Sequence, residues 1–97
     1  MPAYLVTIIT VTQQEQFQDY AKLAGPAVAQ YGGKFLVRGG TRTILEGKFD
    51  ANRLVVVEFP SSERAKTFYN SPEYQAARDK RIGAADFNMV LVEGAGA

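Results

Sequence analysis

The chain has 97 residues, of which 46% are hydrophobic, and its eleven basic and ten acidic side chains give a net charge of +1. This length corresponds to one domain, residues 1–97, and the balanced charge excludes the basic excess typical of proteins that bind nucleic acid or an anionic membrane. Cysteine and histidine are both absent. Disulfides, thiolate nucleophiles, Ser-His-Asp triads and the usual zinc and haem ligands are therefore excluded, and any general acid or base must be Glu, Asp, Lys or Tyr. We expect no metal and no cofactor.

No stretch approaches the roughly 20 apolar residues of a membrane span. The apolar run at residues 4–11 has neither a basic segment before it nor a small-residue cleavage site after it, so it does not resemble a signal peptide. We therefore expect a soluble cytoplasmic protein.

The first predicted elements are a strand and a helix. Residues 4–11 are rich in β-branched side chains, which indicates the strand. Thr12 and Glu15 have the spacing of a capping box, so a helix is expected directly after Thr12. Pro26 predicts a kink or a break in that helix, and the glycine pair at residues 32–33 predicts its end.

The middle of the chain is predicted to form strands. Residues 34–38 and 42–46 are expected to pair as a hairpin around Gly39-Gly40, because glycine tolerates the positive φ angles of a tight turn. Residues 53–59 follow as a third strand of this region after a polar turn.

Two helices are predicted next. Ser61 or Ser62 can cap the first one. Ser71 is then expected to cap the second helix, with Pro72 at its first position. Gly83 predicts its end.

The last predicted strand is residues 87–93, and a mobile tail of small residues is expected at 94–97. The order of elements is strand, helix, strand hairpin, strand, helix pair and strand, which we interpret as a βαββαβ pattern. This order predicts an α+β fold of the ferredoxin-like sandwich type, with the helices on one face of an antiparallel sheet.

Several predicted strands are apolar on both faces. Residues 54–57 and 89–92 are uninterrupted apolar runs, and residues 4–9 are apolar apart from Thr7. Two helical units cover only one face of a sheet, so the other face requires a cover, and a second copy of the same sheet is the simplest one. We predict a homodimer built by sheet-on-sheet packing; a monomer with a partly apolar exposed face is the alternative.

Several sequence blocks together carry a family resemblance. They are GGKFLVRGG at 32–40, LEG at 45–47, VEFPS at 57–61, YNSPEYQ at 69–75, and then Arg78 and Arg81. With them, residues 4–93 resemble the domain of unknown function 1330 family. The resemblance implies the dimeric α/β-barrel superfamily, in which two ferredoxin-like sheets pair into a barrel. The family has no established reaction. The wider superfamily includes monooxygenases, lyases, isomerases and haem-degrading enzymes, several of which use the histidine and tryptophan that this chain lacks.

Tyr74, Arg78 and Arg81 are spaced four and three residues apart, so their side chains share one stripe of the last helix. Neither arginine has an acidic residue three or four positions before it. One interpretation is a site for a carboxylate or phosphate, and the other is a structural ion pair, for instance with Glu46 or Glu58.

Glu58 interrupts an apolar strand and by alternation shares a face with Leu54 and Val56. A partly desolvated carboxylate there would be the best candidate for a general base. The alternative is an ion pair with Arg38 or Arg53 on a neighbouring strand.

The remaining candidates have simpler interpretations. Arg38 and Glu46 flank the predicted hairpin and are expected to pair across it. Tyr20, Tyr31 and Tyr69 are expected in the core with their hydroxyls at its rim. Ser71 is a helix cap, since no histidine is present to activate it.

The leading hypothesis is therefore a homodimer that binds a small organic anion in a pocket between helices and sheet. The candidate ligand-binding residues are Arg38, Tyr69, Tyr74, Arg78 and Arg81. If the protein is an enzyme, cofactor-independent proton transfer or oxygenation with Glu58 as base is the expected class. The alternative is a non-catalytic structural or interaction module.

Overall fold

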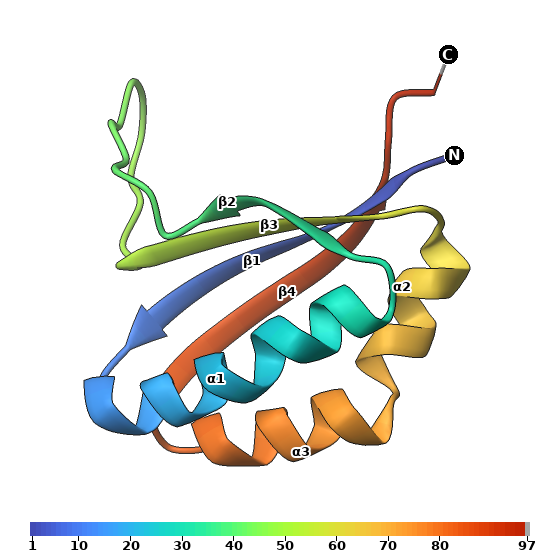
Figure 1. The fold of residues 1–97 in the computed structure, drawn as a ribbon. Coiled ribbons are helices and arrows are strands. Elements are labelled where there is room, and N and C mark those ends of the chain that lie inside the picture. The colour runs from blue at the N-terminus through green and yellow to red at the C-terminus, as the bar shows by residue number, and fades with distance from the viewer. Residues whose placement is uncertain (97) are drawn as a thin grey trace.

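A computed structural model describes residues 1–96 of the chain, which form one sheet and three helices. The elements are β1 (Ala3–Val11), α1 (Gln14–Gln30), β2 (Lys34–Arg38), β3 (Arg53–Phe59), α2 (Ser62–Tyr69), α3 (Pro72–Arg81) and β4 (Ala85–Glu93). The strands pair antiparallel in the order β2-β3-β1-β4, and the helices lie on one face of the sheet (Figure 1). The predicted ferredoxin-like α+β arrangement is confirmed. Within residues 1–96 no helix has the length and apolarity that crossing a membrane requires.

Serine side chains start α2 and α3. The Ser61 hydroxyl accepts a hydrogen bond from the Arg64 backbone N–H at 3.1 Å, and the Ser71 hydroxyl accepts one from the Tyr74 backbone N–H at 3.1 Å. Each bond satisfies a helix donor that has no partner within the helix. Pro72 occupies the first helical position, where its missing N–H costs nothing. Both predicted caps are confirmed.

The predicted N-cap of α1 is wrong, and of the kink or break predicted at Pro26 the break does not occur. Thr12 is not a cap, because its hydroxyl donates to the Ala84 carbonyl at 3.0 Å, and the N-cap residue Gln13 makes no side-chain capping bond. The helix is also unbroken at Pro26 and continues to Gln30 (Figure 1). Packing of its apolar face against the rest of the core holds it together despite the missing donor. Gly32, at φ 81°, then ends it as expected.

The predicted hairpin between residues 34–38 and 42–46 is also wrong. Residues 42–46 form no strand, and β2 pairs directly with β3. The chain turns away at Gly39, whose N–H donates to the Leu54 carbonyl at 2.9 Å, and the following loop stands out from the sheet (Figure 1). Asn52 fixes its far end, since its side chain bonds both the N–H and the carbonyl of Val11 at 2.9 and 3.1 Å. The pairing of β2 with β3 thus forms in place of the local hairpin that Gly39-Gly40 predicted.

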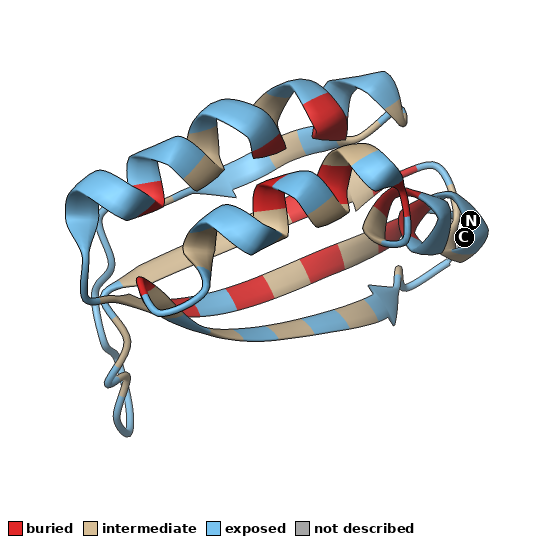
Figure 2. Cartoon of the chain, turned by 90° about the horizontal axis from the view of Figure 1, so that it is seen from below, coloured by how far each residue is buried: buried red, intermediate tan, exposed pale blue. Residues whose placement is uncertain are grey.

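The core lies between the helices and one face of the sheet. Alternate strand residues, among them Leu5, Val57 and Phe59, point toward the helices and are buried (Figure 2). The intervening residues point to the opposite face, where Val90 is 61% exposed and Val92 is 46% exposed. None of the helices within residues 1–96 covers that second face, so the two-sided apolar character of the strands leaves apolar side chains in solvent.

The two ends of the chain lie at the same end of the molecule (Figure 1). The first residue of the predicted tail, Gly94, donates its N–H to the Pro2 carbonyl at 2.8 Å. The tail is therefore anchored where it leaves β4. The last residue of the predicted tail, Ala97, lies outside the described residues.

Candidate functional site

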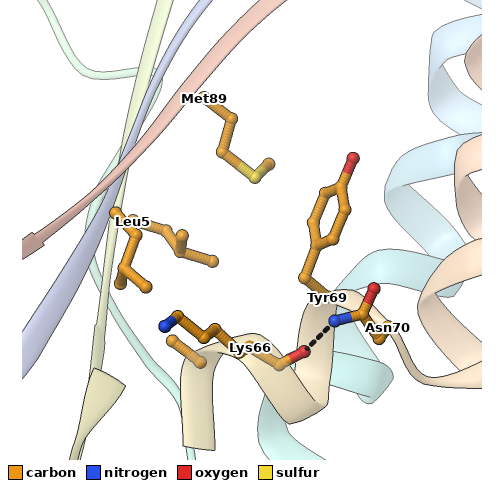
Figure 3. Close-up of a pocket in the computed structure, with 7 residues that line it drawn as sticks. Leu5, Lys66, Tyr69, Asn70 and Met89 are labelled. Atoms are coloured by element: carbon orange, nitrogen blue, oxygen red, sulfur yellow. Dashed lines mark hydrogen bonds between the residues drawn. The ribbon is translucent and has the colours of Figure 1, made fainter. Parts of the chain in front are cut away.

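A cavity of about 230 Å³ opens between α2 and the part of the sheet formed by β1 and β4. We call it the α2 cleft. Its lining residues are Leu5, Ala65, Lys66, Tyr69, Asn70, Met89 and Leu91. Side chains from the helix and from the two strands point into this common space, with Met89 and Tyr69 on either side of it (Figure 3).

The strand pattern explains why the cleft is open. Met89 and Leu91 are two residues apart on β4 and so point to the same face, and Leu91 is paired with Leu5 of β1. Because β4 is an edge strand, its helix-facing side chains have a neighbouring strand on one side only and are only half-buried. An apolar floor is thus left accessible beside α2.

The polar groups of the cleft come from the end of α2. Asn70 donates from its side-chain amide to the Lys66 carbonyl at 3.0 Å (Figure 3), and the Tyr69 carbonyl accepts from the Gln75 side chain at 2.7 Å. These bonds fix the backbone of the helix end. The ionisable side chains of the lining are Lys66 and Tyr69. Within residues 1–96 there is no cluster of three or more acidic side chains that could hold a metal ion.

Tyr74, a predicted ligand residue, lies behind the cleft in the core. It is only 1% exposed, and its ring centroid is 5.4 Å from that of Tyr69. Its hydroxyl is 3.1 Å from the hydroxyl of Tyr20, so the two phenols share a hydrogen bond. Burial raises the pKa of Tyr20, the proximity of Tyr74 adds to this, and Arg81 opposes it. Tyr74 can therefore support Tyr69 but is not available on the cleft surface.

The two arginines of the predicted stripe lie outside the lining of the cleft. The Arg81 guanidinium stacks on Phe87 and lies 5.6 Å from the Tyr20 ring centroid. The Nε atoms of Arg78 and Arg81 are buried and find no hydrogen-bond partner among the residues that the structure describes. Aromatic packing of the Arg81 guanidinium was not anticipated from the sequence, although Phe87 alternates with Met89 on the same face of β4.

Neither predicted acidic partner of these arginines is on their side of the sheet. Glu58 alternates with the buried Val57 and Phe59, so it points to the face opposite the helices. Glu46 belongs to the exposed loop that stands out from the sheet. The predicted ion pairs between this stripe and Glu46 or Glu58 are therefore wrong.

Glu58 is accordingly not brought together with the other candidate residues. In register it stands between Tyr4 of β1 and Lys34 of β2, and it lines a groove with Lys34 and Pro60. The alternative partners Arg38 and Arg53 do not flank it, because Arg38 is paired with Val55 at the other end of the strand pair. The cross-strand neighbour of Glu58 is Lys34.

Arg38 is likewise separate from the α2 cleft. Its guanidinium carbon lies 4.2 Å from the Phe35 ring centroid, on the helix-facing side of edge strand β2. The predicted pair with Glu46 is wrong, because residues 42–46 form no strand opposite β2. Of the five predicted ligand-binding residues, only Tyr69 lines the α2 cleft.

Sequence reasoning missed Lys66, Asn70 and Met89. A usable signal existed for two of them: Lys66 and Tyr69 are three residues apart and so share a side of α2, and Met89 alternates with Leu91. What the sequence did not reveal is that α2 stands opposite the edge strand, which is a property of the tertiary packing.

Comparison with protein families gives one match. A family model with the description "Domain of unknown function (DUF1330)" matches residues 2–95. None of the curated proteins matches the chain.

Solved structures share the fold at low sequence identity. A protein of unknown function from Rhodopseudomonas palustris superimposes with a TM-score of 0.78 at 21% identity, covering 99% of this chain and 84% of that one. A dimeric ferredoxin-like protein of unknown function from Jannaschia sp. CCS1 gives a TM-score of 0.76 at 12% identity, covering 97% of this chain and 100% of that one. SnoaB, a cofactor-independent oxygenase from Streptomyces nogalater, gives a TM-score of 0.66 at 13% identity, covering 99% of this chain and 95% of that one. At these identities the similarity establishes the fold.

Proposed function

The chain belongs to the DUF1330 family, and we propose that it binds a small organic anion with an apolar body in the α2 cleft. The observation that carries the proposal is the composition of the lining, in which apolar side chains surround the two ionisable groups Lys66 and Tyr69. Ligand pockets typically have this form, with an apolar wall and a few polar groups that fix orientation. Lys66 supplies the positive charge for the anionic end.

The size of the cleft limits the ligand. Its volume of about 230 Å³ lies below the roughly 300–1,000 Å³ of pockets for drug-sized molecules. A compound with one ring or a short chain fits this space. Its apolar body would lie on Met89 and Leu91 and its anionic group near Lys66, where a charge-assisted hydrogen bond can form.

Titration with benzoate and its neutral analogue benzamide, followed by NMR, tests this proposal. We expect benzoate to shift signals of Tyr69 and Met89, and Lys66→Gln to weaken benzoate binding while leaving benzamide unchanged. Lys22→Gln, at an exposed position of α1, is the matched control. Equal benzoate affinity in the Lys66 and Lys22 variants would contradict the role of Lys66, and shifts confined to the other sheet face would contradict the site.

Arg38, Arg78 and Arg81 stay candidate anion ligands from the sequence hypothesis. Arg78 and Arg81 have buried Nε atoms without partners, which supports an interaction with an anion that approaches α3. The same titration with Arg78→Gln and Arg81→Gln separates the possibilities. Loss of benzoate binding in these variants, with Lys66→Gln unaffected, would transfer the anion site from α2 to α3.

Cofactor-independent oxygenation or proton transfer in the α2 cleft is the second candidate function. The cleft combines an apolar wall with two ionisable side chains, which is the composition of many enzyme pockets, and the Streptomyces protein of the same fold is described as a cofactor-independent oxygenase. The base in this cleft would be Tyr69 or Lys66, since Glu58 points to the opposite face of the sheet. Oxygen uptake with catechol should exceed the uncatalysed rate and be lost in Tyr69→Phe; equal rates with and without protein would exclude oxygenation of this substrate.

We also propose that two chains associate through their open sheet faces. Apolar side chains gather there, among them Val6, Ile8, Val56, Val90 and Val92. Large exposed apolar patches are uncommon on monomers, and covering this one would be favourable. The description of the Jannaschia protein as dimeric supports association into a dimer.

Sedimentation velocity tests the dimer. The native chain should sediment as a dimer at micromolar concentration, and Val90→Glu should shift it toward monomer. Leu23→Glu, at a 42% exposed position of α1, is the control and should stay dimeric. A dimer that binds neither benzoate nor benzamide would favour the alternative of a non-catalytic structural module.

A further inference from the structure

Two arginines face a second, smaller cavity under α1. Arg38 ends β2 and Arg53 begins β3, and both line a cavity of about 40 Å³. Its remaining lining residues are Ile9, Phe17, Tyr20, Ala21, Ala24, Phe35 and Val55. None of these residues lines the α2 cleft, so the two sites are distinct.

Strand register brings the two guanidinium groups to the same side of the sheet. Arg53 and Val55 are two residues apart on β3, and Arg38 is paired with Val55, so all three point toward α1. Each arginine also lies over an aromatic ring: Arg38 is 4.2 Å from the Phe35 centroid and Arg53 is 5.4 Å from the Phe17 centroid. At these distances each positive charge is attracted by the face of its aromatic ring.

Two glycines leave room for the arginine side chains. At Gly39, whose φ is 70°, a Cβ atom would overlap the Arg53 guanidinium. At Gly25 of α1, a Cβ atom would lie 3.3 Å from a terminal nitrogen of Arg38. A side chain at Gly39 would require the Arg53 guanidinium to move, and one at Gly25 would require a small shift of Arg38.

The positive charges of the cavity lack a compensating negative charge. No acidic residue is among its lining residues, and the Nε atom of Arg53 is buried without a hydrogen-bond partner. Burial, and secondarily the charge of Arg38, lowers the pKa of Arg53. A buried charged donor without a partner is costly, and two like charges in one site add to that cost.

We propose that Arg38 and Arg53 form a binding site for a small carboxylate. The volume of about 40 Å³ compares with roughly 30 Å³ for one water molecule in the liquid, so the site accepts a single carboxylate group and no ring. A carboxylate is the anion whose two oxygens match the forked donors of guanidinium groups. Binding would neutralise the repulsion between the arginines.

Thermal unfolding of the full chain in sodium formate tests this site, with sodium chloride at the same ionic strength as reference. The melting temperature of the native chain should rise with formate and saturate, as expected for a ligand that binds the folded state. In Arg38→Gln the apparent Kd for formate should weaken roughly tenfold or more, because one charged donor group is lost. Arg42→Gln, which replaces an exposed arginine of the loop, should respond like the native chain.

The stability without formate gives a second readout. Removing a like charge should leave Arg38→Gln at least as stable as the native chain in chloride, whereas a structural role for Arg38 predicts a lower melting temperature in every salt. The side chain of Arg38 is exposed, so this variant is expected to fold even if Arg53→Gln does not. The proposal is overturned if formate raises the melting temperature of the native chain and of Arg38→Gln equally. It is also overturned if formate raises the melting temperature of the native chain no more than chloride does.

Discussion

The guanidinium carbon of Arg81 lies 3.7 Å from the ring centroid of Phe87, which joins the end of α3 to the start of β4. The same guanidinium lies 5.6 Å from the Tyr20 ring of α1. One side chain therefore contacts an aromatic surface that belongs to two other elements. The contact explains how an arginine without a hydrogen-bond partner at Nε can be half-buried at this position.

Replacing Arg81 by Gln should lower the free energy of unfolding by about 1–2 kcal/mol, because both the cation–π contact and the packing of the aliphatic stem are lost. Urea denaturation measures this change. Lys80→Gln, at the exposed neighbouring position, should change stability by no more than about 0.5 kcal/mol. Equal effects of the two substitutions would show that stacking on Phe87 contributes nothing.

Replacing Tyr74 by Phe should cost about 1–2 kcal/mol, since the Tyr20 hydroxyl then loses its partner inside the core. The double variant Tyr20→Phe/Tyr74→Phe removes both polar groups and should cost less than the sum of the two single changes. Urea denaturation of all four proteins provides the coupling energy. Strict additivity would argue against the hydrogen bond between the two phenols.

Stability should fall as the pH rises above about 10, the ordinary pKa of tyrosine. Burial raises the pKa of Tyr20 in the folded state, so the folded chain keeps this proton at pH values where the unfolded chain has lost it. The unfolded state then binds fewer protons, and the free energy of unfolding decreases with pH. Urea midpoints between pH 8 and pH 11.5 measure the slope. The stability of Tyr20→Phe should fall less steeply with pH. An unchanged slope in this variant would assign the effect to other groups.

Replacing Ser71 by Ala should destabilise the protein by about 1–2 kcal/mol. The buried Ser71 hydroxyl accepts from the Tyr74 N–H and also donates to the Phe68 carbonyl at 2.7 Å, so it satisfies groups of both α2 and α3. Ser61→Ala is the comparison and should cost only about 0.5–1 kcal/mol, because its cap is exposed to water. A larger loss of stability in Ser61→Ala than in Ser71→Ala, measured by thermal or urea unfolding, would contradict the argument from burial.

Replacing Gly33 by Ala should cost about 1–3 kcal/mol through overpacking. A Cβ atom there would lie 2.7 Å from a methyl group of Val28 and 2.8 Å from the Phe59 ring. Gly40→Ala is the matched control, since a Cβ atom at Gly40 would have no atom within 4 Å. Comparable urea midpoints for the two variants would mean that the core near Phe59 adjusts freely.

The order of the elements was predictable from the sequence because local chemistry determines it. The hydroxyls of Ser61 and Ser71 cap helices where the chain presents free N–H groups, and the three β-branched valines at 55–57 favour an extended backbone. The same locality explains the errors. Gly39-Gly40 is compatible with a hairpin, and only competition between possible partners decided that residues 34–38 pair with 53–59.

The candidate site depended on the tertiary structure. Residues 54–57 are apolar on both sides, so alternation alone could not tell which face meets the helices. Glu58 was therefore grouped with Arg78 and Arg81, although it points to the other face of the sheet. The residue types available for chemistry, the helix caps and the two-sided strands all follow from the order of amino acids along the chain. The packing of α2 beside the edge strand decided that Lys66, Tyr69 and Met89 share a cleft, because contacts between residues far apart in the chain arise only when the elements pack.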